Sequence, residues 1–365
     1  MDNKITNFLN LIHKQTIKNR KFYTFGYQKE YHKKANYDYG YIPFVTGLDF
    51  FEKEEIIPKT NPRNRCGDLK EFTEFVVVHD TASGAPSANG KAHANWINSM
   101  ANDINSTTTV SWHFTVDEDG IYQHLPTDEV GYHAGDGTSV KLTYVDTNIQ
   151  AENERCMVTI NEQGFFEING KNTNIEAPRN NEGNIVKNNQ LPYQGINVKI
   201  GNKGTYLLGN TYWNNSYGIL ANKGGNLNSV GIETCVNYGS DYIKTMRQTA
   251  YLVAKLLLKY DLGLEKVKQH NFFSGKDCPM TIRHANMWEE FLDIVNIYLI
   301  YFKDFKGYNF KFESLSKEFL DNSGKVIKHK DDLIVKYKVE VSKEDFKKEY
   351  YFESKLEKLS FEINE

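Results

Sequence analysis

Residues 75–79 read Phe75-Val76-Val77-Val78-His79, four apolar side chains followed by a histidine. A short apolar run rich in β-branched residues predicts a strand that is buried on both faces. Residues 229–236 form a second run of this kind, and residues 244–260 carry leucines at helical spacing, which predicts a helix. We interpret these elements as the buried centre of a folded domain. Other strands are predicted at 110–116, 121–124, 205–208 and 267–269, and other helices at 88–102 and 287–301.

The composition excludes several classes of protein. The 365 residues are 39% hydrophobic and 13% aromatic, which excludes a disordered chain and suffices for sizeable cores. The net charge of -3 argues against a nucleic-acid binder, which would be more basic. The chain contains no run of about 18 apolar residues, so no membrane insertion is predicted. Residues 1–22 lack the features of a secretory signal.

The four cysteines are too few and too widely spread for a disulfide framework, so we expect synthesis in a reducing cytoplasm. Three of them read as free thiols, namely Cys66, Cys156 and Cys235.

Three segments flank or interrupt the expected core. Residues 1–55 form an aromatic, basic leader, whose first turns place Ile5, Phe8, Leu9 and Ile12 at helical spacing. Residues 139–225 are rich in Asn and Gly with short strand candidates, which predicts a β-rich insertion. Residues 303–365 hold 14 lysines and 14 acidic residues around three alternating segments, which predicts a small all-β module. The main domain is therefore expected at 56–302.

Two histidines and a cysteine lie at strand ends and in one loop. His79 ends the first strand, His270 follows a short strand, and Cys278 closes the loop after it. Two imidazoles and a thiolate match a catalytic zinc site, which uses three protein ligands and leaves one position open. Each residue alone is weak evidence, because a strand-end histidine is commonly a satisfied structural residue.

Two charged residues accompany these ligand candidates. Glu233 lies in an apolar strand, where a carboxylate is costly unless it has a partner or a chemical task. The alternative is a glutamate on the exposed face of an edge strand. Lys276 precedes Cys278 by two residues and could stabilise an oxyanion, although a lone loop lysine is more often only solvated.

Five stretches occur together in a recognisable order. They are Val76 to Ala82, Val110 to Asp117, Glu129 to Gly137, Asn228 to Glu233 and His270 to Pro279. With them the chain resembles the zinc-dependent N-acetylmuramoyl-L-alanine amidases of the type 2 amidase and peptidoglycan-recognition-protein superfamily, and phage endolysins in particular. The resemblance covers residues 56–302, less the insertion. It implies an α/β fold with a mixed central β-sheet, helices on both faces and a zinc at the edge of the sheet.

The resemblance also implies roles for individual residues. One zinc ion per chain would be held by His79, His270 and Cys278. Some members of the family use a tyrosine as second catalytic group, but the corresponding position here is Trp112, which cannot do the same proton chemistry. The catalytic pair is therefore expected to be Glu233 and Lys276.

Substrate contacts are expected at three positions, His133, Trp112 and Thr81. His133 lies in a loop that should border the cleft, and Thr81 follows a ligand. His113 is expected to serve for packing or orientation.

The implied activity is hydrolysis of the amide between N-acetylmuramic acid and the L-alanine of bacterial peptidoglycan, by a phage or prophage endolysin. An enzyme of this kind without a signal peptide is made in the host cytoplasm and reaches the wall by holin-type release or on a virion. The 303–365 module is a candidate for contact with a cell-wall polymer or a virion, or for dimerisation.

Three other readings stay open at this point. A non-catalytic recognition protein of the superfamily typically lacks the cysteine, which is present here. A hydrolase with Cys278 as nucleophile and His270 as base would need a thiolate of lowered pKa. A virion tail protein that carries the domain would differ in delivery and not in chemistry.

Overall fold

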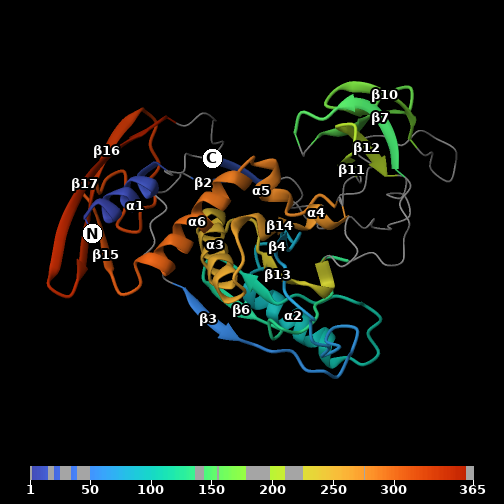
Figure 1. Ribbon diagram of the computed structural model, residues 1–365, viewed down its shortest axis with the longest axis horizontal. Coiled ribbons are helices and arrows are strands. Elements are labelled where there is room, and N and C mark those ends of the chain that lie inside the picture. The colour runs from blue at the N-terminus through green and yellow to red at the C-terminus, as the bar shows by residue number, and fades with distance from the viewer. Residues whose placement is uncertain are drawn as a thin grey trace.

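The structure is a computed structural model, shown in Figure 1. It describes residues 2–14, 20–24, 34–38, 50–135, 144–153, 156–177, 198–209, 225–274 and 276–358.

A six-stranded mixed sheet forms the centre of the fold, in the strand order β14-β4-β13-β5-β6-β3. Its strands are β3 (Phe51–Glu54), β4 (Phe75–Asp80), β5 (Phe114–Val116), β6 (Gly120–Gln123), β13 (Ser229–Thr234) and β14 (Val267–Gln269). The strands β14, β4, β13 and β5 are parallel, whereas β6 pairs antiparallel with β5 and parallel with β3. The two apolar runs of the sequence are thus the central strands β4 and β13, as predicted.

Alternation along these strands separates two faces of the sheet. Val76 and Val230 belong to a large core cluster with the helices α3 (Tyr242–Lys259) and α6 (Trp288–Asp304). Val77, one residue further along β4, belongs to a different cluster with Phe273 of the short helix α4 (His270–Ser274). The helix α2 (Gly90–Asn102) contacts β5 and β6 and contributes to a third small cluster. Helices therefore cover both faces, which confirms the predicted fold class.

The remaining short elements near the sheet are α5 (Met280–His284) and the 3-10 helices η3 (Gly225–Leu227) and η4 (Leu264–Lys266). The helix α4 lies in the stretch that the sequence analysis treated as a loop, and α5 lies in residues to which it assigned no element. They are only five residues long, so hydrophobic periodicity had too few positions to reveal them.

The insertion contains two three-stranded antiparallel sheets. Their strands are β7 (Tyr144–Gln150), β8 (Val158–Ile160), β9 (Phe165–Ile168), β10 (Lys171–Glu176), β11 (Val198–Ile200) and β12 (Thr205–Gly209). They share a small core of their own, which includes Phe166 and Tyr206. Figure 1 shows these strands to one side of the central sheet, in green and yellow-green. The described part of the insertion is β-rich, as predicted.

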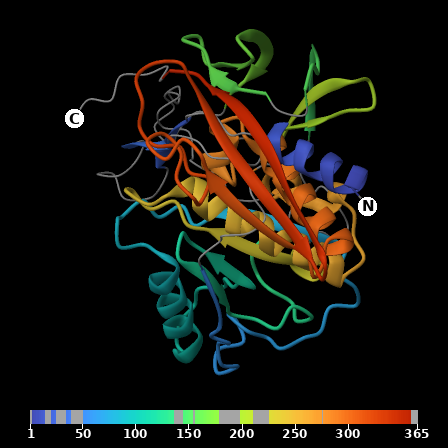
Figure 2. The ribbon, with the colours of Figure 1, turned by 90° about the vertical axis from the view of Figure 1, so that its left-hand side faces the viewer.

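The C-terminal residues form a three-stranded antiparallel sheet of β15 (Asn309–Ser314), β16 (Leu333–Lys343) and β17 (Phe346–Leu356). The predicted N-terminal helix, α1 (Asp2–Lys14), lies against this sheet in both views (Figures 1 and 2). Phe8 stacks on Phe305 at 4.6 Å between ring centroids, and His13 Nδ1 contacts the Tyr337 hydroxyl at 2.9 Å. All four of the predicted apolar positions of α1 are buried.

The expected division of the chain at residues 55 and 303 therefore does not separate independent cores. The helix α1, the C-terminal sheet and α6 share one continuous apolar cluster with the central sheet. The expected leader also contributes β3, an edge strand of the central sheet, which the sequence analysis did not predict. Two further leader strands, β1 (Arg20–Thr24) and β2 (Lys34–Asp38), form an antiparallel hairpin.

Three smaller findings complete the fold. The predicted strand at 110–116 is shorter than expected, because only Phe114–Val116 pair in the sheet. All four cysteines are free thiols. Within the described ranges, no helix has both the length and the apolar character that a membrane span requires.

Candidate active site

Two adjacent parallel strands place a histidine and a glutamate side by side. His79 and Glu233 are direct partners in the register of β4 and β13, so both side chains project from the same face of the sheet. The distance between His79 Nδ1 and Glu233 Oε1 is 3.8 Å. The side chain of His79 is buried, and that of Glu233 is 16% exposed. The glutamate is thus on an internal strand and not on an exposed edge.

The other two ligand candidates come from the segment after β14. His270 is the first residue of α4, and its ring centroid lies 4.6 Å from that of His79. Cys278 Sγ lies 3.8 Å from His79 Nδ1. One donor atom from each of the three residues lies within 4.8 Å of the others, and all three residues are buried. The structure therefore brings together the three residues that the sequence analysis grouped.

The loop that carries Cys278 is fastened at both ends. Asn271 donates its backbone N–H to the Cys278 carbonyl at 3.0 Å and its side-chain amide to the Lys276 carbonyl at 2.9 Å. On the other side, the Asp80 carboxylate accepts the Thr281 N–H at 2.5 Å, at the beginning of α5. Because Asp80 directly follows His79, this bond ties the cysteine loop to the strand that carries the first histidine.

Burial dominates the electrostatics of the cluster. It lowers the pKa values of His79 and His270 well below their ordinary value, so both imidazoles are neutral and can donate a lone pair. It raises the pKa of the Cys278 thiol and raises the pKa of Glu233 to about 8. The charge of Lys276 acts on all four groups and lowers the pKa values of Cys278 and Glu233.

The unpartnered atoms of the cluster fit a metal ion. Among the described residues, His270 Nδ1 and Glu233 Oε2 are buried without a hydrogen-bond partner. A buried polar atom without a partner is costly, and a cation at this point would bind the imidazole nitrogen and offset the charge of the nearby carboxylate. Two imidazole nitrogens and one sulfur are the borderline-soft donors that zinc prefers. The residues present therefore fit zinc.

His133, which we expected to contact substrate, is buried in contact with the ring of His79. It is 8% exposed, and its Nδ1 lies 3.0 Å from His79 Nε2. Its ring covers the backbone of Gly231, where an added Cβ would come within 2.6 Å of the ring. Burial lowers the pKa of His133 to about 3, so it is neutral. This position gives no support to a direct contact between His133 and substrate.

The other two expected substrate contacts differ in their positions. The Trp112 indole is 5% exposed, donates to Thr115 Oγ1 at 2.7 Å and stacks on Trp96. It packs in a small core under α2, so substrate contact finds no support here either. Thr81 directly follows β4, and its hydroxyl has no hydrogen-bond partner among the described residues. A role for Thr81 in substrate binding stays a prediction.

His113 also has a structural position. Its Nε2–H donates to the Glu129 carbonyl at 2.9 Å, and its Nδ1 accepts the Gly231 N–H at 3.0 Å. Both ring nitrogens are therefore occupied by backbone groups. This agrees with the expected role in packing or orientation.

Three residues near the cluster were missed in the sequence analysis. Ser229 Oγ lies 3.4 Å from His133 Nε2. Asn226 Oδ1 accepts the N–H groups of residues 133, 134 and 135 at 2.8, 2.9 and 3.1 Å, so one side chain fixes the whole loop. Gly231 offered a signal, because glycine inside a buried strand often marks a close approach of another group. Ser229 and Asn226 offered none.

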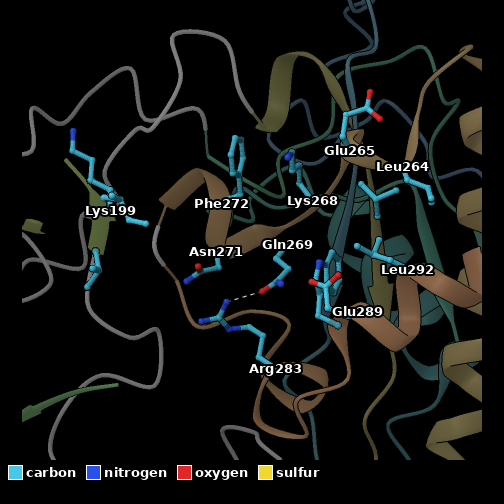
Figure 3. Close-up of a pocket in the computed structure, with 14 residues that line it drawn as sticks. Lys199, Leu264, Glu265, Lys268, Gln269, Asn271, Phe272, Arg283, Glu289 and Leu292 are labelled. Carbon is cyan, nitrogen blue, oxygen red and sulfur yellow. Dashed lines mark hydrogen bonds between the residues drawn. The ribbon is translucent and has the colours of Figure 1, made fainter. Parts of the chain in front are cut away.

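A cavity of about 480 Å³ lies between β11 of the insertion and the core (Figure 3). On the core side it is lined by residues of β14, α4 and α6, and Arg283 donates to Gln269 Oε1 at 2.6 Å across its wall. Gln269 and Asn271 line it and flank His270 in sequence, but none of the three ligand candidates does. The cavity is therefore distinct from the cluster.

Comparison with known proteins identifies the family. Residues 70–281 match a family model described as N-acetylmuramoyl-L-alanine amidase. The N-acetylmuramoyl-L-alanine amidase CwlH of Bacillus subtilis (strain 168) is 27% identical over 241 residues, which are 66% of this chain and 59% of that protein. The amidase XlyA of the same organism is 25% identical over 217 residues, 60% of this chain and 42% of that protein. The chain thus spans about half the length of these curated relatives.

Among solved structures, the catalytic domain of XlyA is similar, with a TM-score of 0.39 and 23% identity over 67% of this chain and 99% of that domain. The family model covers more than half of the chain and includes all three residues of the cluster. The chain belongs to the N-acetylmuramoyl-L-alanine amidase family.

Proposed function

We propose that this amidase is a zinc-dependent peptidoglycan hydrolase that cleaves the amide bond between N-acetylmuramic acid and the L-alanine of the stem peptide. The observation that carries the proposal is the buried cluster of His79, His270 and Cys278 beside the carboxylate of Glu233. Family membership supports the reaction class, and the donor set supports zinc.

In the proposed reaction His79, His270 and Cys278 would hold one zinc ion. When bound, zinc would supply Lewis-acid chemistry, namely polarisation of a carbonyl group and a lowered pKa of water. Glu233 accepts a proton from the attacking water and delivers it to the leaving amine nitrogen. In the metal-free chain burial raises the pKa of Glu233 to about 8, and a cation held by the cluster would lower that pKa toward the range in which the carboxylate can accept a proton at neutral pH.

Lys276 would act on the oxygen of the scissile carbonyl, where negative charge develops. Its positive charge already lowers the pKa values of Glu233 and Cys278, so it lies within electrostatic reach of the reacting groups. A cation held by the cluster would lower the pKa of Glu233 in the same direction, which favours the proton-accepting form.

A hydrolase that uses the cysteine as nucleophile is less consistent with these surroundings. Such an enzyme needs a thiolate whose pKa is lowered by a nearby cation. Burial instead raises the pKa of Cys278, and it lowers the pKa of His270, so that the two groups would both be neutral. A metal ion removes this conflict, because coordination stabilises the thiolate directly.

The test digests purified peptidoglycan with the full chain and measures two products in parallel. An amidase releases new L-alanine amino termini and no new reducing sugars. Removal of metal with a chelator should abolish the release, and added zinc should restore it. Cys278→Ser should bind zinc weakly and stay inactive after zinc is added. New reducing ends without new amino termini, or full activity in the chelator, would contradict the proposal.

The biological setting is part of the same proposal. An endolysin would act on the host wall at lysis, after release from the cytoplasm or as part of a virion. The outer face of the C-terminal sheet is covered by paired charges, such as Lys338 with Glu313 and Glu349. A contact of this sheet with a wall polymer or a virion is best tested on the whole chain, because α1 supplies part of its core.

A further inference from the structure

We propose that His133 and Ser229 form a hydrogen-bonded relay that fixes the ring of His79 so that its Nδ1 lone pair faces the metal cluster. The two residues would then be positioning residues that set metal affinity without touching metal or substrate. The inference rests on the proposed function, because it assumes that the cluster holds zinc.

The direction of each hydrogen bond follows from the far end of the relay. The Gly225 carbonyl can only accept, so the Ser229 hydroxyl, 2.5 Å away, must donate to it. The Ser229 oxygen is then free to accept from His133 Nε2, which lies 3.4 Å away. A neutral imidazole that carries its proton on Nε2 has a lone pair on Nδ1.

The same logic extends to the ligand. His133 Nδ1 accepts from His79 Nε2 at 3.0 Å, so His79 carries its proton on Nε2. Its Nδ1 is left as the lone-pair nitrogen, and this is the atom that lies 3.8 Å from both Cys278 Sγ and Glu233 Oε1. A backbone carbonyl in η3 thus determines, through two side chains, which nitrogen of His79 can bind metal. Groups that orient a ligating histidine in this way commonly contribute to metal affinity.

The surroundings hold the relay in place. The His133 ring lies against the backbone of Gly231 on one side and meets the His79 ring on another, at 5.1 Å between centroids. Asn226 fixes the backbone of His133 through its N–H. Gly225, the end of the relay, has a φ of +77° and packs so closely on Ala134 that an added Cβ would come within 2.7 Å of its carbonyl oxygen. These contacts therefore leave the His133 ring little freedom to rotate.

The test measures metal affinity and not activity. The zinc dissociation constant of the full chain is determined at one fixed pH by competition with a chromophoric chelator, and cobalt(II) is used as a second, spectroscopic probe. His133→Phe removes the acceptor for His79 but keeps a planar ring. His133→Asn keeps an acceptor oxygen near the position of Nδ1. Ser229→Ala removes the middle of the relay, and His124→Phe is the matched control, because His124 is a buried histidine that bonds to Thr115 and not to the cluster.

We expect His133→Phe to weaken zinc binding about 10- to 100-fold, which is the usual effect of losing an orienting partner. The cobalt absorption bands of that variant should also shift, because His79 is no longer held in one orientation. His133→Asn should restore most of the affinity, Ser229→Ala should lose part of it, and the His124 control should bind like wild type.

Each outcome is informative. Circular dichroism of the metal-free variants measures whether they are folded. If His133→Phe is not folded, then Ser229→Ala and His133→Asn carry the test. Equal zinc affinity in wild type, His133→Phe and Ser229→Ala would overturn the relay while leaving the metal centre intact. A wild-type chain that binds no zinc would overturn the proposed metal centre itself, and the relay with it.

Discussion

Replacing Glu233 with glutamine should stabilise the metal-free protein at alkaline pH and at the same time abolish hydrolysis. The carboxyl group is buried beside His79, and its pKa is raised from 4.5 to about 8, mainly by loss of solvation. A glutamine of nearly the same shape carries no ionisable group. The substitution therefore removes the cost of burying a charge and leaves the shape of the site unchanged.

The sign and the size of the effect follow from the raised pKa. Below pH 4.5 both the folded and the unfolded chain keep the proton. The free energy of unfolding should therefore change with pH in the same way in wild type and variant. Between pH 4.5 and about 8 the unfolded chain releases the proton but the folded chain retains it, so the wild type loses stability as the pH rises. At about 1.4 kcal/mol per pH unit, the loss reaches at most about 5 kcal/mol above pH 8. Glu233→Gln should not show this loss.

The assay is urea unfolding at pH 4.5 and at pH 8.5, in excess chelator so that bound metal does not contribute. The control is Glu162→Gln, since Glu162 is exposed in the turn between β8 and β9. The Glu233→Gln variant should exceed wild type in free energy of unfolding only at the higher pH, by up to a few kcal/mol. Equal stability of the two proteins at pH 8.5 would refute the buried, ionisable setting that we assign to Glu233.

The catalytic part of this prediction uses the zinc-loaded proteins. Loss of a general base typically lowers the rate about 10²- to 10⁴-fold. Glu233→Gln should show a loss of this size on peptidoglycan while it still binds one zinc ion, because Glu233 is not one of the three expected ligands. Turnover like that of wild type would show that another group moves the proton.

Two further predictions concern Gly231 and Asn226, which hold His133 in place. Gly231→Ala should lower the free energy of unfolding in chelator by about 1–3 kcal/mol, the usual cost of overpacking, because its Cβ would lie 2.6 Å from the tightly held His133 ring. Urea titration measures this loss, and the control is Gly201→Ala, whose Cβ meets only the flexible side chain of Leu207. Equal losses in the two variants would contradict the prediction. Asn226→Ala should leave three backbone N–H groups without their acceptor and cost about 1–3 kcal/mol. Amide exchange at residues 133 and 134 should become faster in that variant, and unchanged exchange would show that the loop is held by other contacts.

Much of the central sheet could be predicted from periodicity alone. The strands β4 and β13 are apolar runs because they are buried on both faces, and α1 shows its buried positions at helical spacing. The edge strand β3 escaped prediction, because all four of its residues are exposed and its sequence lacks an apolar pattern. Pairing of β3 with β6 depends on where the chain passes and not on its local sequence.

The site shows the same division between local and long-range information. The three ligand candidates could be grouped from residue type and from their positions at strand ends, and the structure brings them together. The orientation of His133 could not be predicted, because it depends on Asn226, which is 93 residues away in sequence. The burial of Trp112 was missed for a similar reason, since its stacking partner Trp96 becomes a neighbour only when α2 packs on the sheet.

The register of β4 and β13 explains why the proposed base and the proposed relay occupy the same face of the sheet. Parallel pairing sets His79 opposite Glu233, and side chains alternate along the strand, so Gly231 and Ser229 project toward the same side as Glu233. Glu233, Gly231 and Ser229 are thus spaced two residues apart on one strand. A shift of one residue in this pairing would move all three to the opposite face, which is filled by α3 and α6. The apolar residues Val230 and Ile232, which anchor that opposite face, therefore also hold Glu233, Gly231 and Ser229 in position.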